Sequence, residues 1–120
     1  KLVDEWSSRQ LKRLLYMTER RIRYASAPEL RKAAVYFKSG SWYGCKKEEG
    51  FNCGAYRGNV RNFMNSVAIV EEEVEGKRLH YVTIVISNVL RENSAQAHQE
   101  LGNQVHRMIK AEHAKDAAVP

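Results

Sequence analysis

The sequence predicts an α+β fold, with N- and C-terminal helices packed on an antiparallel sheet of about three strands. The chain has 120 residues, 43% of them hydrophobic, which is enough to form one core. Apolar residues recur at helical spacing near both ends, and runs of strand-forming residues separated by a short turn lie in the second half. The expected order is therefore helix, strand, long loop, β-hairpin and helix, in a single domain or sub-domain fragment spanning 1–120.

The first helix is expected from about Ser8 to Tyr24, where apolar residues form one stripe. Ser7 or Ser8 is the expected N-cap, and Ser7 with Gln10 matches a capping box. The segment Ala25–Pro28 ends the helix, because a proline disfavours helical backbone at the residue before it. The stripe comprises Leu11, Leu14, Leu15, Thr18 and Ile22, and the opposite basic face comprises Arg9, Lys12, Arg13, Arg20 and Arg23.

A short strand is expected at Ala34–Phe37, because this run is apolar and rich in β-branched or aromatic residues. A long loop is expected over Trp42–Asn62. Five of the seven glycines lie between Gly40 and Gly58, interleaved with aromatic residues. Loops of this length inside a domain are uncommon and are often functional or disordered.

A β-hairpin is expected next, with strands at Phe63–Val74 and Arg78–Leu90 joined by Glu75–Lys77. Both faces of the third strand are largely apolar, so we expect it to be central and covered on both sides. The three glutamates 71–73 fall near the hairpin tip, where water is available.

The final helix is expected to be capped by Asn93 or Ser94 and to run to about His113, followed by a frayed tail at 115–120. The four histidines lack metal-ligand spacing, which predicts surface or packing roles and no metal site. The expected buried stripe comprises Ala97, Leu101, Val105, Met108 and Ile109.

The net charge of +6 lies entirely in the first third of the chain. Residues 1–38 contain ten Lys or Arg and four Asp or Glu, whereas the remainder contains ten of each. This bias indicates either a solvated helical face or contact with a polyanion. No apolar run approaches the roughly 20 residues of a membrane span. Cys45 and Cys53 either close a small disulfide loop or remain free thiols.

The segment Lys38-Ser39-Gly40-Ser41, directly after the first strand, has the chemistry of a ligand-binding strand end. A strand edge can hold a ligand by main-chain hydrogen bonds, and a lysine there adds a positive charge. The adjacent hydroxyl can bind a carboxylate, and the glycine permits close approach of a ligand backbone.

This segment resembles the Lys-[Thr/Ser]-Gly element of class A-like serine β-lactamases and penicillin-binding DD-peptidases. The segments Ser8–Leu11 and Val82–Ser87 are similar to a helix opening and the last strand of that family, and Asn93-Ser94 followed by Met108-Ile109 to its last helix. The resemblance covers nearly the whole chain, but only the C-terminal part of the family's domain. The long loop after the motif departs from the family pattern.

The resemblance implies the C-terminal segment of a bacterial, exported, periplasmic or cell-envelope penicillin-recognising hydrolase. Its substrate would be a β-lactam or a D-alanyl peptide, with no cofactor. In this interpretation Lys38 is the electrostatic residue and the Ser41 backbone N–H an oxyanion-hole donor. Substrate binding would use Ser39, Gly40 and either Arg57 or Arg61.

The nucleophile of that family lies in Ser-x-x-Lys, and none of the eight serines has a lysine three residues later. We therefore expect the chain alone to be inactive, with the nucleophile on a missing N-terminal segment. The alternative is a non-catalytic module that binds nucleic acid or another polyanion through its basic helix and aromatic loop, although no sequence-specific nucleic-acid motif is present. An inactive relative that keeps the fold is a third possibility.

Overall fold

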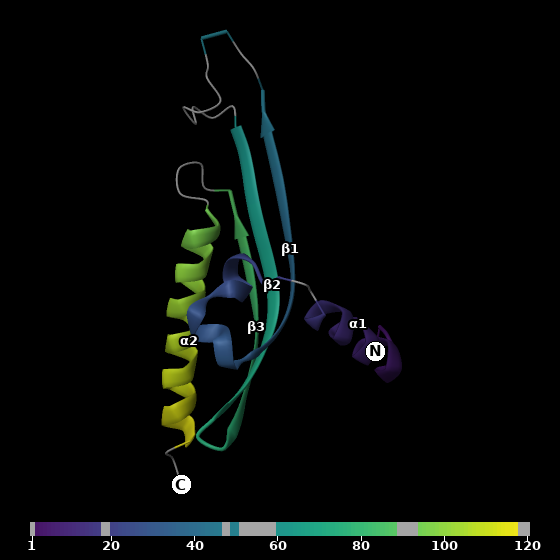
Figure 1. Cartoon of the computed structure of the whole chain (residues 1–120), viewed down its shortest axis with the longest axis vertical. Coiled ribbons are helices and arrows are strands. Elements are labelled where there is room, and N and C mark those ends of the chain that lie inside the picture. Colours follow the sequence, from purple (N-terminus) through teal and green to yellow (C-terminus); the bar gives the residue numbers. More distant parts are fainter. Residues whose placement is uncertain (1, 18–19, 47–48, 51–59, 89–93, 118–120) are drawn as a thin grey trace.

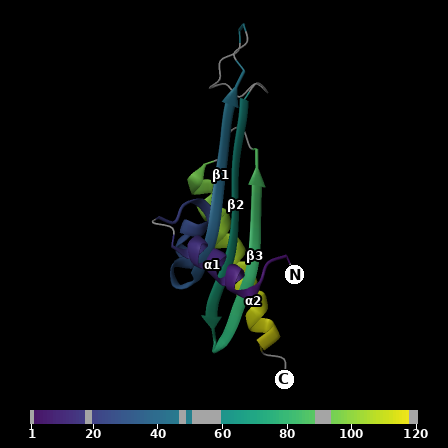
Figure 2. The ribbon, with the colours of Figure 1, turned by 90° about the vertical axis from the view of Figure 1, so that its right-hand side faces the viewer.

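The computed structural model describes residues 2–17, 20–46, 49–50, 60–88 and 94–117, and its fold is α+β as expected. The helix α2 covers one face of a three-stranded sheet and α1 lies on the other side (Figures 1 and 2). The molecule is elongated, at 64 × 34 × 27 Å. Its elements are α1 (Glu5–Tyr16), η1 (Arg23–Ser26), η2 (Pro28–Lys32), β1 (Ala34–Cys45), β2 (Val60–Val74), β3 (Lys77–Ser87) and α2 (Ala95–Ala117), where η marks 3₁₀-helices.

The sheet has the order β1-β2-β3, and both pairs are antiparallel. The expected hairpin is confirmed, with a two-residue turn in which Glu75 and Gly76 have φ angles of 52° and 75°. Positive φ at both positions is typical of the turn that matches the twist of the strands. The prediction that β3 is central was wrong, because β2 lies between the other two strands.

The core lies between the sheet and α2. Alternate residues of β1 and β2 point toward it, and η1 contacts α2 on one side and both of these strands on the other. Burying each large apolar side chain stabilises the fold by roughly 1.5–3 kcal/mol. The core comprises Tyr24, Ala25, Ala27, Leu30, Ala33, Val35, Phe37, Ala68 and Val70.

The opposite face of the sheet is open over its upper part. The side chains of Val82, Ile84 and Ile86 are 59%, 66% and 75% exposed. At the lower end α1 packs on β1, where the Tyr16 and Tyr36 rings lie 5.4 Å apart. The period-two pattern of β3 marks two apolar faces, but it does not say which of them is covered.

The first helix is shorter than expected, ending at Tyr16 rather than Tyr24. Its cap is Asp4 instead of Ser7 or Ser8, and the Asp4 carboxylate accepts a hydrogen bond of 2.7 Å from the Ser7 N–H. Tyr24 is fully buried, so the chain leaves the helix to place this ring in the core. No residue of α1 is buried, and the expected apolar stripe is exposed over much of its length.

The strand β1 extends to Cys45 and β2 begins at Val60, so both strands include residues of the predicted loop 42–62. Lys38 therefore lies inside a strand instead of directly after one. Gly40 and Ser41 have weak strand propensity, but pairing with β2 determines their conformation. The part of the loop at 47–48 and 51–59 lies outside the described residues.

The helix α2 is capped by Ser94, whose hydroxyl accepts a hydrogen bond of 3.0 Å from the Ala97 N–H. It continues to Ala117, past the expected end near His113 and into the tail expected to fray. The predicted stripe was partly wrong, because Ala97, Leu101 and Met108 are exposed while Val105 and Ile109 are partly buried. The buried positions on this helix are His98, Gly102 and His106.

Replacing Gly102 by alanine is expected to destabilise the chain. The added Cβ would lie 2.8 Å from the Ala27 Cβ and 3.0 Å from the Tyr24 carbonyl oxygen. Overpacking of this kind costs about 1–3 kcal/mol, which outweighs the gain of about 1 kcal/mol in helix propensity. Urea unfolding should show a lower midpoint for Gly102→Ala. Gly44→Ala is the control, since its Cβ would meet nothing within 4 Å, and a raised midpoint for Gly102→Ala would contradict the packing of α2 on η1.

Candidate functional site

The segment Lys38–Ser41 lies in the middle of β1 and pairs with Met64–Val67 of β2. Successive side chains of a strand point to opposite faces, so Lys38 is on the open face and Ser39 on the α2 face. The two residues meet at the main chain, where Lys38 Nζ donates a hydrogen bond of 2.6 Å to the Ser39 carbonyl. A carboxylate that contacts both the ammonium and the hydroxyl would have to lie at the strand edge.

Every second residue of β1 directs its main-chain groups to the free edge, away from β2. Arg23 Nη1 lies 2.6 Å from the Gly40 carbonyl oxygen and 3.3 Å from that of its partner Asn65. One nitrogen can reach both oxygens only if both lie between the two strands. The N–H and C=O groups of Ser39 and Ser41 therefore point to the outer edge, where an added strand would bind.

Arg23 is a residue of this site that the sequence did not reveal. We expected it on the basic face of the first helix, but it lies in η1 with a φ angle of 52°, uncommon for a residue other than glycine. Its guanidinium braces the main chain of Gly40 and Asn65. No local sequence signal marks such a residue, because the contact joins positions far apart in the chain.

A shallow depression of about 340 Å³ lies beside this segment. Its lining residues come from all three strands and include Lys38 and apolar side chains of the open face, so it offers both polar and apolar contacts. The lining residues are Lys38, Ser39, Gly40, Asn65, Ser66, Val67, Ile84, Val85 and Ile86.

Of the two arginines expected to bind substrate, Arg61 does not lie beside Lys38. Arg61 is in register with Gly44, six residues along β1 from Lys38, and its guanidinium lies 5.5 Å from the centre of the Trp42 ring. Arg57, the other candidate, lies outside the described residues. The roles of Lys38, Ser39, Gly40 and Ser41 remain predictions.

A serine–histidine pair in the core does not have the geometry of an activated nucleophile. The Ser87 hydroxyl donates a hydrogen bond of 2.7 Å to the Met64 carbonyl, and His98 Nε2 lies 3.1 Å from the same oxygen. Because the single hydroxyl proton is used by the carbonyl, His98 is the donor to Ser87. Burial, helped by the charge of Arg23, lowers the pKa of His98, which favours the neutral ring.

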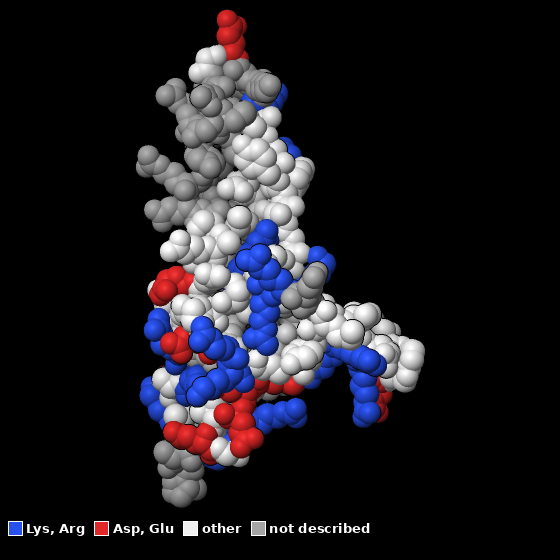
Figure 3. All heavy atoms as spheres, viewed as in Figure 1, with Lys and Arg blue, Asp and Glu red and all other residues white. Residues whose placement is uncertain are grey.

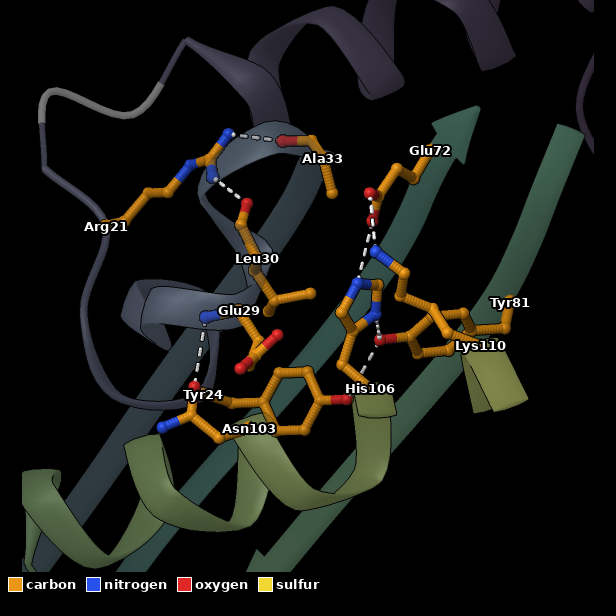
Figure 4. Close-up of polar contacts among 10 residues, drawn as sticks. All are labelled: Arg21, Tyr24, Glu29, Leu30, Ala33, Glu72, Tyr81, Asn103, His106 and Lys110. Atoms are coloured by element: carbon orange, nitrogen blue, oxygen red, sulfur yellow. Dashed lines mark hydrogen bonds and ion pairs between the residues drawn. The ribbon is translucent and has the colours of Figure 1, made fainter. Parts of the chain in front are cut away.

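A buried polar chain joins α2 to the sheet and to η1 (Figure 4). His106 is fully buried, with Nε2 2.7 Å from Glu72 and Nδ1 3.0 Å from the Tyr81 hydroxyl, which lies 3.3 Å from that of Tyr24. Lys110 donates a second hydrogen bond of 3.0 Å to Glu72. Burial, with the hydrogen bond to Tyr24, raises the pKa of Tyr81, so its hydroxyl stays protonated and can donate to His106.

Two of the three glutamates predicted near the solvated hairpin tip are instead paired, whereas Glu73 is exposed as expected. The side chains of Glu71 and Glu72 are 12% and 7% exposed. Lys12 and Tyr36 donate hydrogen bonds to Glu71, and the Lys12 bond is the main cause that lowers the pKa of this carboxyl. The Lys12 contact fastens α1 to the sheet.

The basic residues of the first third are partly committed to contacts within the chain. Arg9 pairs with Glu5, Lys12 with Glu71, and Arg23 with the main chain. Arg21 donates hydrogen bonds to the Leu30 and Ala33 carbonyls (Figure 4). In the space-filling view the basic side chains gather over the lower half of the molecule, interspersed with acidic ones (Figure 3).

Cys45 is disulfide-bonded. The only other cysteine of the sequence is Cys53, which lies outside the described residues. Within the described ranges, no group of three or more His, Cys, Asp or Glu side chains is placed to hold a metal ion. No helix of this part of the chain is long and apolar enough to cross a membrane.

Comparison with protein-family models, with curated proteins and with solved structures finds no match to this chain. The resemblance to β-lactamases and DD-peptidases therefore stays a prediction from the motif and the order of the elements.

Proposed function

We propose that this chain supplies the substrate-binding strand of a penicillin-recognising serine hydrolase of the β-lactamase or DD-peptidase kind. The observation that carries the proposal is the position of Lys38–Ser41 at the outer edge of β1, which no strand of the described residues pairs with, beside a shallow depression. An extended acyl donor could add to this edge through the outward main-chain groups of Ser39 and Ser41.

Each residue of the segment has a distinct role in this proposal. Lys38 supplies a positive charge on the open face, and the Ser39 hydroxyl is the candidate contact for a substrate carboxylate. The Ser41 N–H would stabilise the oxyanion that forms when the acyl carbonyl is attacked. At Gly40 an added Cβ would meet nothing within 4 Å, so space there is open to a ligand.

The reaction would be acyl transfer to a serine on another segment, followed by hydrolysis. The attacking serine oxygen forms the acyl bond as the amide C–N bond breaks, and the leaving nitrogen takes a proton. Water then cleaves the acyl ester and releases the acid. The 120 residues contain no Ser-x-x-Lys, so this chain contributes binding and electrostatic stabilisation rather than the nucleophile.

The disulfide-bonded state of Cys45 supports an exported protein. Disulfides persist mainly in oxidising compartments such as the bacterial periplasm. The location therefore agrees with the cell-envelope substrates that this family acts on.

The proposal is tested on the 120-residue chain by recording amide NMR spectra during titration with benzylpenicillin and with acetyl-D-Ala-D-Ala. We expect shifts at the Ser39 and Ser41 amides that weaken in Lys38→Ala and persist in Lys115→Ala. Lys115 is an exposed lysine near the end of α2 and serves as the matched control. Mass spectrometry should show no penicilloyl adduct.

Two results would count against it. Shifts that avoid the β1 edge with both ligands would remove the binding role. A covalent penicilloyl adduct would overturn the prediction that this chain lacks the nucleophile.

A further inference from the structure

Beyond the end of β3, the β1–β2 ribbon continues as an arm that comprises Trp42–Cys45 and Val60–Phe63 (Figure 1). β3 ends at Ser87, opposite Met64, so among the described residues the arm has two strands. The alternation that places Ser39 and Ser41 at the outer edge also places Tyr43 there. The edge proposed to bind a ligand therefore continues along the arm.

Trp42 contacts an aromatic and a cationic neighbour on the face of the sheet that carries Lys38. Its ring lies 5.8 Å from that of Phe63 at an interplanar angle of 18°, and the Arg61 guanidinium lies 5.5 Å from its centre. Trp42 is 60% exposed, so the cluster is accessible. An arginine stacked on an aromatic ring keeps its N–H edge available for bidentate contact with a carboxylate.

A hollow of about 250 Å³ adjoins this cluster and is lined by Trp42, Gly44, Cys45, Lys46 and Arg61. The described residues of 38–46 and 60–70 contain three cationic side chains and no Asp or Glu. In Figure 3 the acidic side chains visible on this side of the molecule lie over its lower half and at the far tip. The charge along the ribbon therefore favours an anionic ligand.

The spacing between Lys38 and this cluster limits the size of a ligand that reaches both. Trp42 follows Lys38 by four positions along the strand, which corresponds to about 13 Å. An extended dipeptide spans only about 7 Å, whereas four residues span about 13–14 Å.

We propose that the ligand of the β1 edge is an extended peptide of about four residues or more. Its terminal carboxylate lies near Lys38 and Ser39, and an anionic side chain toward its other end binds Arg61 against Trp42. This inference rests on the proposed function and deepens it by naming the substrate class.

The test uses the full 120-residue chain and two probe peptides, acetyl-Glu-Ala-Ala-D-Ala-D-Ala and the same peptide with Gln in place of Glu. Calorimetry should show that the Glu peptide binds about fivefold more tightly, as expected for one exposed ion pair. In Arg61→Gln the two peptides should bind equally, whereas Arg31→Gln, a control outside the arm, should retain the difference. Trp42→Ala should weaken both peptides, with an unchanged far-UV circular dichroism spectrum.

Equal affinity of the two peptides for the unmodified chain would overturn the role of Arg61. If acetyl-D-Ala-D-Ala binds as tightly as the longer peptide and shifts the same amides, the length requirement fails while the proposed function stands. If neither the peptides nor benzylpenicillin shift the Ser39 and Ser41 amides, the proposed function fails too. Binding of oligo-dT that Trp42→Ala abolishes, without peptide binding, would instead make the arm a nucleic-acid site.

Discussion

Replacing His106 by alanine is expected to destabilise the chain by about 3–5 kcal/mol, the usual cost of truncating a large, fully buried side chain that is also hydrogen-bonded to buried partners. The imidazole is fully buried and links Glu72 to the Tyr81 hydroxyl. Its removal leaves a cavity and deprives a nearly buried carboxylate of one of its two hydrogen-bond donors. Urea unfolding followed by circular dichroism should show this as a large fall in the midpoint.

His80→Ala is the matched control, since the His80 side chain is 55% exposed and lies 3.8 Å from Glu71. Its effect should stay within about 0.5 kcal/mol. Tyr81→Phe, which removes only the hydroxyl, should cost about 1–2 kcal/mol. Equal urea midpoints for His106→Ala and His80→Ala would contradict the stabilising role of the buried hydrogen bonds of His106.

The acid dependence of the free energy of unfolding independently tests the buried hydrogen bonds to Glu72. Burial alone would raise the pKa of Glu72, but hydrogen bonds from Lys110 and His106 outweigh it and hold the pKa below its ordinary value. A lowered pKa contributes stability above the ordinary glutamate pKa of about 4.3, and this stability is lost as the pH falls below it. The decline should be shallower in Glu72→Gln, measured at the same series of pH values.

A second large effect is expected at Lys38 in a protein that joins this chain to the nucleophilic serine of the proposed function. Lys38→Ala should lower the acylation rate by about 10²–10³-fold, because one electrostatic contact to the transition state is lost. Stopped-flow fluorescence with a labelled penicillin measures this rate. Stability should change by less than about 1 kcal/mol, since the side chain is exposed and its hydrogen bond goes to its own neighbour, Ser39.

Lys115→Ala in the same protein should leave acylation unchanged. Lys38→Arg retains the charge and should recover part of the rate, which separates an electrostatic role from a packing role. An unchanged acylation rate in Lys38→Ala would contradict the electrostatic role assigned to this lysine.

The buried hydrogen-bond network of Glu72, His106, Tyr81 and Tyr24 is connected to the candidate site through η1. Tyr24 is the last member of the buried hydrogen-bond network, where its hydroxyl contacts that of Tyr81. Its neighbour Arg23 donates hydrogen bonds to the carbonyl oxygens of Gly40 and Asn65. Packing of α2 therefore helps to position the segment proposed to bind substrate. A variant that weakens the packing of α2 is expected to shift the amide NMR signals of Ser39 and Ser41, although the substituted residue contacts neither serine.

Several features of the fold were predictable from local sequence. The Glu75–Gly76 turn, the antiparallel pairing of β1 with β2, and the Ser94 cap each depend on residues adjacent in the chain or on the order of the elements. The α+β class follows from the same signals. The motif at Lys38–Ser41 was located by its composition, although not its position inside a strand.

What the sequence by itself determined was therefore the class of the fold, the order of its elements and the location of the candidate motif. The tertiary structure decided which strand is central, which face of the sheet is open, and which side chains are buried. Glu72 and Arg23 read locally as solvated residues and His106 as a surface or packing histidine, yet all three are placed by partners distant in the chain. The physical reason is that periodicity reports which residues share a face, whereas burial and pairing depend on what packs against that face.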